Sequence, residues 1–113
     1  MDTKMNYRVE NNRVVNDKGE VAVIYSPGYG AGWYTWNRDF KDCVFDPDCV
    51  FDLIHNHGEN IVTIAEKKWP DGYWNGGLNA KLFWFPVGTK FVIEEYDGYE
   101  SIRFYQDLDI IIV

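Results

Sequence analysis

The sequence predicts an α+β fold: an antiparallel β-sheet of about six to seven strands, with two short helices inserted in the middle of the chain. Two observations predict it. Short apolar and β-branched runs, separated by turn residues, form an N-terminal meander and C-terminal hairpins. Helical periodicity with capping residues occurs only between residues 46 and 69. The chain has 113 residues and shows no linker or internal repeat, so residues 1–113 are predicted to form a single domain.

The first third of the chain is predicted to be a β-meander. Residues 7–10 and 13–15 are short strand-like runs, and Asn11-Asn12 between them is a turn pair that tolerates positive φ. A second turn, at residues 17–19, precedes the apolar, β-branched run at residues 20–25. That run is long enough for a central strand of the sheet.

Two helices are predicted in the middle of the chain. Asp46 is a candidate N-cap, Pro47 suits the first helical position, and Gly58 is a candidate C-cap. The apolar face of this helix comprises Cys49, Val50, Leu53, Ile54 and His57. A second short helix is predicted over about residues 60–69, where Pro70 stops it.

The last third of the chain is predicted to return to β-structure. The expected strands cover residues 82–85, 90–96, 99–105 and 109–113, and Asp97-Gly98 is a strong signal for a two-residue hairpin turn. The residues expected to be mostly buried are Val21, Val23, Leu53, Ile54, Ile61, Leu82, Trp84, Phe91, Ile93, Ile102 and Phe104.

Charge and composition exclude several classes of function. A formal net charge of −7 and the lack of a basic stripe argue against binding of duplex nucleic acid. No apolar run is long enough to cross a membrane, and the first residues lack the apolar segment of a secretory signal. Cys43 and Cys49 are therefore expected to be reduced thiols in a cytosolic setting.

The glycine-rich segment at residues 28–37 is the first candidate binding site. Its glycines would let a partner approach the backbone closely, and its aromatic side chains are rigid, with polar ends. Its spacing does not match the dinucleotide-binding fingerprint, which needs a helix directly after the glycines. The candidate contact residues are Tyr29, Trp33, Tyr34, Trp36 and Asn37. The competing interpretation is that Trp33 and Trp36 fold back over the core.

The acidic cluster around the Asp97-Gly98 turn is the second candidate. Paired carboxylates could act as acid and base on a sugar, although such clusters are more often solvated hairpin tips. Arg103 is expected to pair across the strands with Glu94 or Glu95. The candidate binding residues here are Glu95, Asp97, Glu100 and Arg103.

The sequence contains no catalytic or metal-binding constellation that we recognise. The spacing of Cys43, Cys49, His55 and His57 does not match a zinc knuckle. No serine lies in a nucleophile-elbow motif, and the cysteines lack an obvious orienting partner. We therefore expect no catalytic residues, no bound metal and no cofactor, and a protein that is not an enzyme.

Three segments carry a family resemblance: GEVAVIYSPGYGAGWYTWN at 19–37, FDPDCVFDLI at 45–54 and GGLNAKLFWFPVGTKFVIEEYDGYESI at 76–102. In this order they resemble a family of small, largely uncharacterised proteins encoded by tailed bacteriophages and related mobile elements. The resemblance spans roughly residues 13–103. It implies an accessory protein made in the cytoplasm of an infected bacterium, where such proteins often bind and inhibit a host or defence component.

These observations predict a non-enzymatic accessory protein that modulates or inhibits a host or defence protein by direct contact. A homo-oligomer is a further option. One alternative is a small-molecule sponge that sequesters a nucleotide signal, which would require a concave site with Arg or Lys; Arg38 and Lys41 are the basic residues nearest the loop. Another is a minor structural or assembly protein of the phage.

Overall fold

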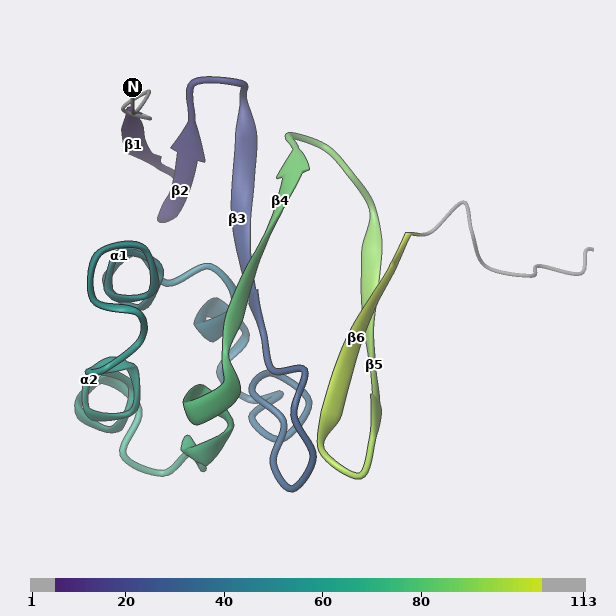
Figure 1. Cartoon of the computed structure of the whole chain (residues 1–113). Coiled ribbons are helices and arrows are strands. Elements are labelled where there is room, and N and C mark those ends of the chain that lie inside the picture. The colour runs from purple at the N-terminus through teal and green to yellow at the C-terminus, as the bar shows by residue number, and fades with distance from the viewer. Residues whose placement is uncertain (1–5, 105–113) are drawn as a thin grey trace, which may run out of the picture.

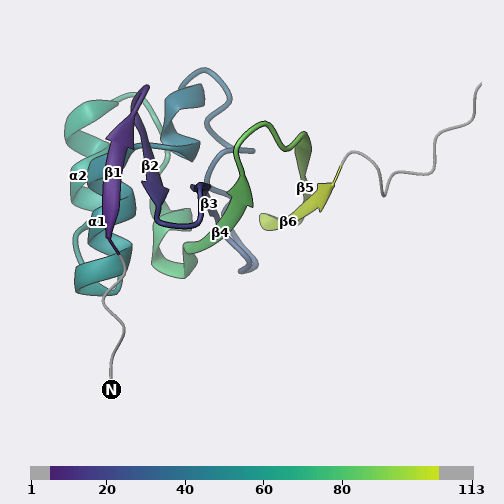
Figure 2. The ribbon, with the colours of Figure 1, turned by 90° about the horizontal axis from the view of Figure 1, so that it is seen from above.

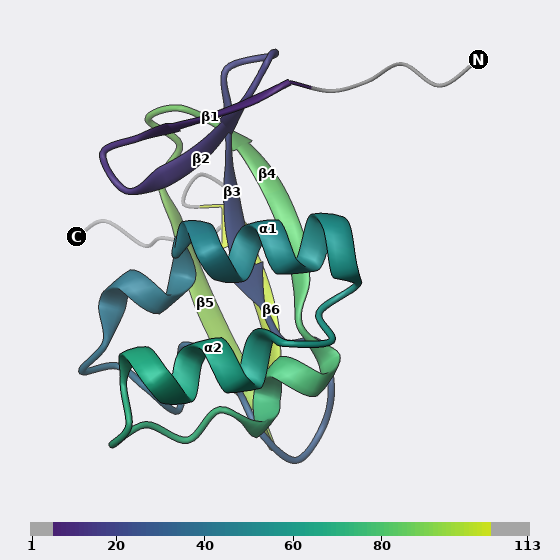
Figure 3. The ribbon, with the colours of Figure 1, turned by 90° about the vertical axis from the view of Figure 1, so that its left-hand side faces the viewer.

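A computed structural model describes residues 6–104 and confirms the α+β fold, in three layers (Figure 1). Two helices form the first layer, a four-stranded sheet the second, and a two-stranded hairpin the third. Viewed from above, the helices lie on one side of β3 and β4 and the hairpin lies on the other (Figure 2). The helices run across the strands rather than along them (Figure 3).

The four-stranded sheet is antiparallel, in the order β1-β2-β3-β4. Its first three strands are the predicted meander: β1 (Tyr7–Glu10), β2 (Arg13–Asn16) and β3 (Glu20–Tyr25). Asn11 and Asn12 both have positive φ, at 51° and 60°, which confirms the predicted tight turn.

Strand β4 (Lys81–Pro86) joins this sheet after the helices. It pairs with β3 over six residues, from Glu20 opposite Pro86 to Tyr25 opposite Lys81. The sheet that begins with β1 to β3 is therefore completed by a strand that follows both helices in the sequence.

Helix α1 (Pro47–Asn56) begins where the capping signals predicted. The side chain of Asp46 accepts a hydrogen bond from the N–H of Cys49 at 3.1 Å, and Lys68 from helix α2 (Ile61–Lys68) donates to the same carboxylate at 2.7 Å. His57 was expected on the apolar face, but it is exposed and caps the helix with a φ of 55°. The helix therefore ends at Asn56, one residue before the last residue of the predicted apolar face.

The hairpin of β5 (Phe91–Tyr96) and β6 (Tyr99–Phe104) forms a separate sheet. Asp97 and Gly98 at its turn have φ values of 50° and 84°, which confirms the predicted turn residues. Two short 3₁₀ helices, η1 (Lys41–Val44) and η2 (Asn75–Asn79), lie in the connections before α1 and before β4.

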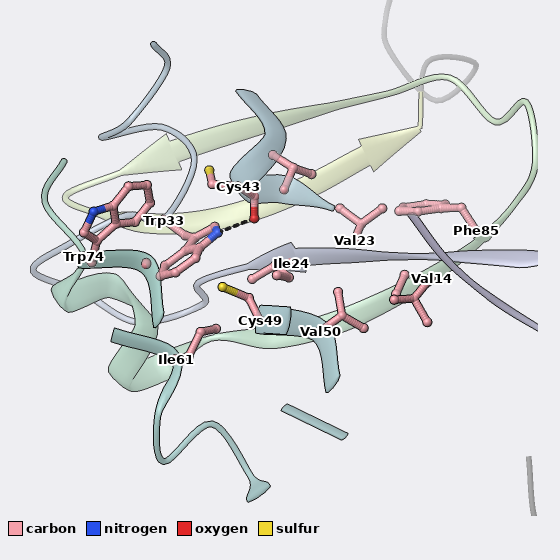
Figure 4. Packing of buried hydrophobic residues seen from close by; sticks show 13 residues of the cluster. Val14, Val23, Ile24, Trp33, Cys43, Cys49, Val50, Ile61, Trp74 and Phe85 are labelled. Atoms are coloured by element: carbon pink, nitrogen blue, oxygen red, sulfur yellow. Dashed lines mark hydrogen bonds between the residues drawn. The ribbon is translucent and has the colours of Figure 1, made fainter. Parts of the chain in front are cut away.

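The core lies between the helices and the sheet and continues between the sheet and the hairpin (Figure 4). On the hairpin side, the Phe85 ring stacks on Phe91 at 4.9 Å and meets the edge of Phe104 at 5.1 Å. Of the expected core residues, only Val23 and Ile61 are fully buried. The others are only partly buried, the six from the hairpin and the helices because these small elements leave their edges open to solvent: Val21, Leu53, Ile54, Leu82, Trp84, Phe91, Ile93, Ile102 and Phe104.

The predicted strand at residues 109–113 lies outside the described residues. Within residues 6–104, no helix has the length and apolar character needed to cross a bilayer.

Candidate functional site

The glycine-rich loop after β3 and the turn of the β5–β6 hairpin meet at one end of the molecule (Figure 1). The N–H of Gly30 donates to the carbonyl of Asp97 at 2.8 Å. The N–H of Glu100 donates to the carbonyl of Ser26, also at 2.8 Å. Gly98 permits this approach, because a Cβ there would lie 2.8 Å from the carbonyl carbon of Gly30. The structure thus brings together the two segments that the sequence singled out.

Glu100 is fully buried in this junction, so the expectation that it lies at a solvated hairpin tip is wrong. One carboxylate oxygen accepts from the N–H of Ser26 at 2.8 Å. The other accepts from both the N–H of Thr35 at 2.8 Å and its hydroxyl at 2.7 Å. Side chains alternate along β6, so Glu100 lies on the same face as Ile102 and Phe104, which pack against the core. The buried side chain of Glu100 therefore joins the hairpin to the loop through these hydrogen bonds.

Trp33 and Asn37 are also buried, so, contrary to the expectation from the sequence, the structure does not place them on a surface that a partner could contact. The indole N–H of Trp33 donates to the carbonyl of Cys43 at 2.8 Å, and its ring lies 4.9 Å from that of Trp74 (Figure 4). The amide of Asn37 donates to the carbonyl of Trp33 at 2.6 Å and accepts from the N–H of Tyr73 at 2.7 Å. For Trp33, the competing interpretation as a lid over the core is confirmed.

Five exposed aromatic side chains surround the junction, and we call them the tip surface: Tyr29, Trp36, Tyr73, Tyr96 and Tyr99. Their exposed fractions range from 37% to 79%. The rings of Tyr29 and Tyr99 lie 5.1 Å apart, and those of Trp36 and Tyr73 lie 5.4 Å apart. Tyr96 and Tyr99 are opposite each other across the hairpin. The tip surface is therefore made by three segments that are distant in sequence.

Sequence reasoning singled out Tyr29 and Trp36 but missed the other three members. The two-residue turn could have revealed Tyr96 and Tyr99, because such a turn places its flanking residues opposite each other on one face. No sequence signal marks Tyr73, which reaches the tip surface only through its contact with Trp36 and the hydrogen bonds of its backbone to Asn37.

Acidic side chains border the tip surface. An oxygen of Glu95 accepts from the indole N–H of Trp36 at 2.9 Å and from the N–H of Gly98 at 2.8 Å. The hydrogen bond from Trp36, followed by that from Gly98, holds the pKa of Glu95 below its usual value. Asp97 is exposed at the turn itself. Two carboxylates thus lie beside the exposed aromatic rings.

Arg103 lies near the other end of the hairpin. Its guanidinium forms an ion pair with Glu94 at 3.3 Å, which confirms the predicted cross-strand pairing. Both side chains are about half exposed, on the same outer face as Tyr96 and Tyr99. Arg103 is therefore available at the surface but does not belong to the junction between loop and hairpin.

Tyr34 lies away from the tip surface, in a groove of about 350 Å³ between β5 and the segment that precedes α1. Arg38 and Lys41 line the same groove, and the guanidinium of Arg38 lies 5.2 Å from the centre of the Tyr34 ring. The structure therefore separates Tyr34 from the other loop aromatics and places it beside two cations.

The two cysteines are fully buried in the core. Burial, and then nearby carboxylates led by Glu100 for Cys43 and Asp46 for Cys49, raises the pKa of both thiols far above the usual value. A protonated, buried thiol is a poor nucleophile and a poor metal ligand. No cluster of three or more potential metal ligands occurs within residues 6–104.

Comparisons of the chain with protein-family models, curated proteins and solved structures give no significant match. The family that the three quoted segments resemble therefore stays a prediction.

Proposed function

We propose that this protein is a non-enzymatic binding protein that docks on a partner protein through the tip surface. The observation that carries the proposal is the gathering of five exposed aromatic rings around a junction fixed by buried hydrogen bonds. Exposed aromatic groups of this size are costly in water unless a partner covers them. Tyr and Trp also contribute disproportionately to binding energy at protein interfaces.

The rigidity of the junction supports the same proposal. Glu100 holds the loop, Glu95 holds Trp36, and the backbone of Gly30 is bonded to that of Asp97. A backbone that is already fixed, and a ring that is already held as that of Trp36 is, lose little conformational freedom on binding, which improves affinity for a given contact area. The carboxylates of Glu95 and Asp97 favour a partner with basic residues around its binding site.

The resemblance to phage-encoded proteins supplies the biological context of the proposal. In that context the partner is a host or defence protein of the infected bacterium, which this protein modulates or inhibits. A minor structural or assembly role in the phage would use the same surface on a phage protein.

The test is capture from a lysate of phage-infected bacteria, followed by affinity measurement with the purified partner. Tyr29→Ala and Tyr96→Ala each remove an exposed ring, and each is expected to weaken binding by about thirtyfold, the effect of losing one dominant contact residue. Asp97→Asn removes a charge and keeps a residue type that tolerates the φ of 50° at this turn. It is expected to slow association, with the difference shrinking at high salt.

Val87→Ala is the matched control, because Val87 is 68% exposed in the turn between β4 and β5, at the opposite end of the hairpin (Figure 1). It should bind as the wild type does. Equal binding by Tyr29→Ala, Tyr96→Ala and the wild type would contradict the proposal. If a second copy of this chain covers the tip surface instead, the wild type will sediment as an oligomer and Tyr96→Ala as a monomer.

A further inference from the structure

The groove beside Tyr34 has an apolar floor and a cationic rim. Its floor is made by Val44 and Phe45 on one side and by three consecutive residues of β5, Phe91 to Ile93, on the other. Three consecutive residues line a groove when an edge of the strand borders it, since alternate side chains point to opposite faces. Within residues 6–104, β5 pairs only with β6, so its other edge offers unpaired backbone groups.

The charge of this groove is opposite to that of the molecule. The chain carries a net charge of −7, yet Arg38 and Lys41 are the only charged residues in the range 6–104 that line the groove. Neither forms an ion pair with any residue in the range 6–104. Asp39 and Asp42 are their neighbours in sequence; they do not line the groove, but they line an adjacent hollow together with Arg38 and Lys41. Two cations at one site, with no carboxylate among the described residues that line it, favour an anionic ligand.

An adjoining hollow of about 340 Å³ extends this pattern. It shares Phe45 and Phe91 with the groove, and among the described residues its lining also contains no Asp or Glu. Its cation is Arg13, whose guanidinium lies 4.1 Å from the centre of the Phe45 ring. Cations thus approach the aromatic lining from both hollows.

We infer that the groove binds a small anionic ligand that carries a planar ring, of the nucleoside monophosphate class. The phosphate would be held by Arg38 and Lys41, which can donate charge-assisted hydrogen bonds to its oxygens. The base would stack on the rings of Tyr34 or Phe45, and the free edge of β5 would bond to the polar edge of the base. The groove volume of about 350 Å³ lies within the range of small-ligand sites.

This site is distinct from the tip surface, because none of Tyr29, Trp36, Tyr73, Tyr96 and Tyr99 lines the groove. The two proposals can therefore fail separately. Lys41→Glu in the groove is expected to leave capture of a partner protein unchanged, and tip-surface variants are expected to leave ligand binding unchanged.

The experiment titrates the full chain with AMP, GMP, CMP and UMP at neutral pH, monitored by calorimetry and by NMR shifts of the Val92 and Ile93 amides. At least one nucleotide is expected to bind with a Kd below about 1 mM. Its nucleoside and inorganic phosphate, each lacking half of the ligand, are expected to bind at least about tenfold more weakly. Binding of inorganic phosphate as tight as that of the nucleotide would overturn the role of the base.

Charge-reversal variants locate the site. Arg38→Glu and Lys41→Glu are each expected to weaken nucleotide binding by at least about tenfold. Lys18→Glu is the control, because it makes the same change in net charge at another exposed lysine, in the turn between β2 and β3. No binding of any of the four nucleotides up to about 2 mM, or equal weakening by Lys41→Glu and Lys18→Glu, would overturn the inference.

Discussion

Glu100 is a fully buried carboxylate. Within residues 6–104 it has no ion-pair partner, yet both of its oxygens are bonded to donors from the loop. A buried charge is costly unless its hydrogen-bonding capacity is met, and here backbone N–H groups and a hydroxyl meet it. One side chain thus holds the loop at two points, Ser26 and Thr35.

Replacing Glu100 is therefore expected to be strongly destabilising. Glu100→Ala leaves the N–H of Ser26 and both donors of Thr35 without an acceptor in the interior, and should lower the free energy of unfolding by about 2–4 kcal/mol. Glu100→Gln keeps the shape but turns an amide NH₂ toward a donor, so an intermediate loss is expected. Urea denaturation measures both.

Glu94→Ala is the comparison, since Glu94 is about half exposed and its ion pair with Arg103 is worth at most about 1 kcal/mol. An unfolding free energy for Glu100→Ala equal to that of Glu94→Ala would show that the buried network contributes nothing to stability.

At the scale of elements, the β5–β6 hairpin is joined to the rest of the fold at both ends. Near its open end, Phe91 and Phe104 pack on Phe85 of β4. At its tip, the turn lies directly against the loop after β3, with Gly98 facing the backbone of that loop. The turn thus has two requirements, a positive φ and the lack of a side chain.

A comparison of Gly98 with Gly88 distinguishes the effect of the positive φ from that of the close contact. Both have positive φ, at 84° and 89°, but a Cβ at Gly88 would meet nothing within 4 Å, whereas one at Gly98 would overlap the loop backbone. Gly88→Ala is expected to cost about 1 kcal/mol of stability from backbone strain alone. Gly98→Ala should cost at least about 2 kcal/mol and should displace the loop.

Thermal melts measure the loss of stability in each of the two variants, and the NMR shift of the Gly30 amide shows whether the loop has moved. Identical melts for the two variants, with an unshifted Gly30 signal, would mean that the loop does not depend on contact with the turn.

At the scale of the whole molecule, one continuous core joins the helices, the sheet and the η1 segment. Cys43 of η1 and Cys49 of α1 are both fully buried in it. Their thiols are protonated in the folded protein, because burial raises the pKa of each far above the usual value. In the unfolded chain the same thiols ionise near pH 8.5.

This difference predicts a loss of stability in mild alkali. Below about pH 8.5 the thiols are protonated in both states and add no pH dependence. Above it, the unfolded chain releases protons that the folded protein retains, so each thiol lowers the unfolding free energy by up to about 1.4 kcal/mol per pH unit. Urea denaturation between about pH 8.5 and 9.5 measures the slope before tyrosines and lysines ionise.

The matched control is the double variant Cys43→Ala/Cys49→Ala, which should show a flatter slope over the same range, whatever its stability at neutral pH. A wild-type slope equal to that of the double variant would contradict the assignment of the thiols to the core. Thiol reagents should also label the native protein far more slowly than the protein in urea.

The sequence by itself determined the local elements. Asp46 and Pro47 set the start of α1, the Asn11-Asn12 and Asp97-Gly98 pairs set two turns, and Pro70 follows the end of α2. These features depend on neighbours a few residues apart, through capping hydrogen bonds and φ preferences, so they are readable without the fold. The α+β class followed from the order of those elements.

Only the tertiary structure decided which side chains are available to a partner. Trp33 and Trp36 lie in the same aromatic run, yet one is buried against Trp74 and the other is 42% exposed. Glu95 and Glu100 flank the same turn, yet only Glu100 is enclosed by the loop. Burial depends on which distant segment packs on each face. No local preference of a residue encodes that choice, so the tip surface and the cationic groove emerged only from the folded chain.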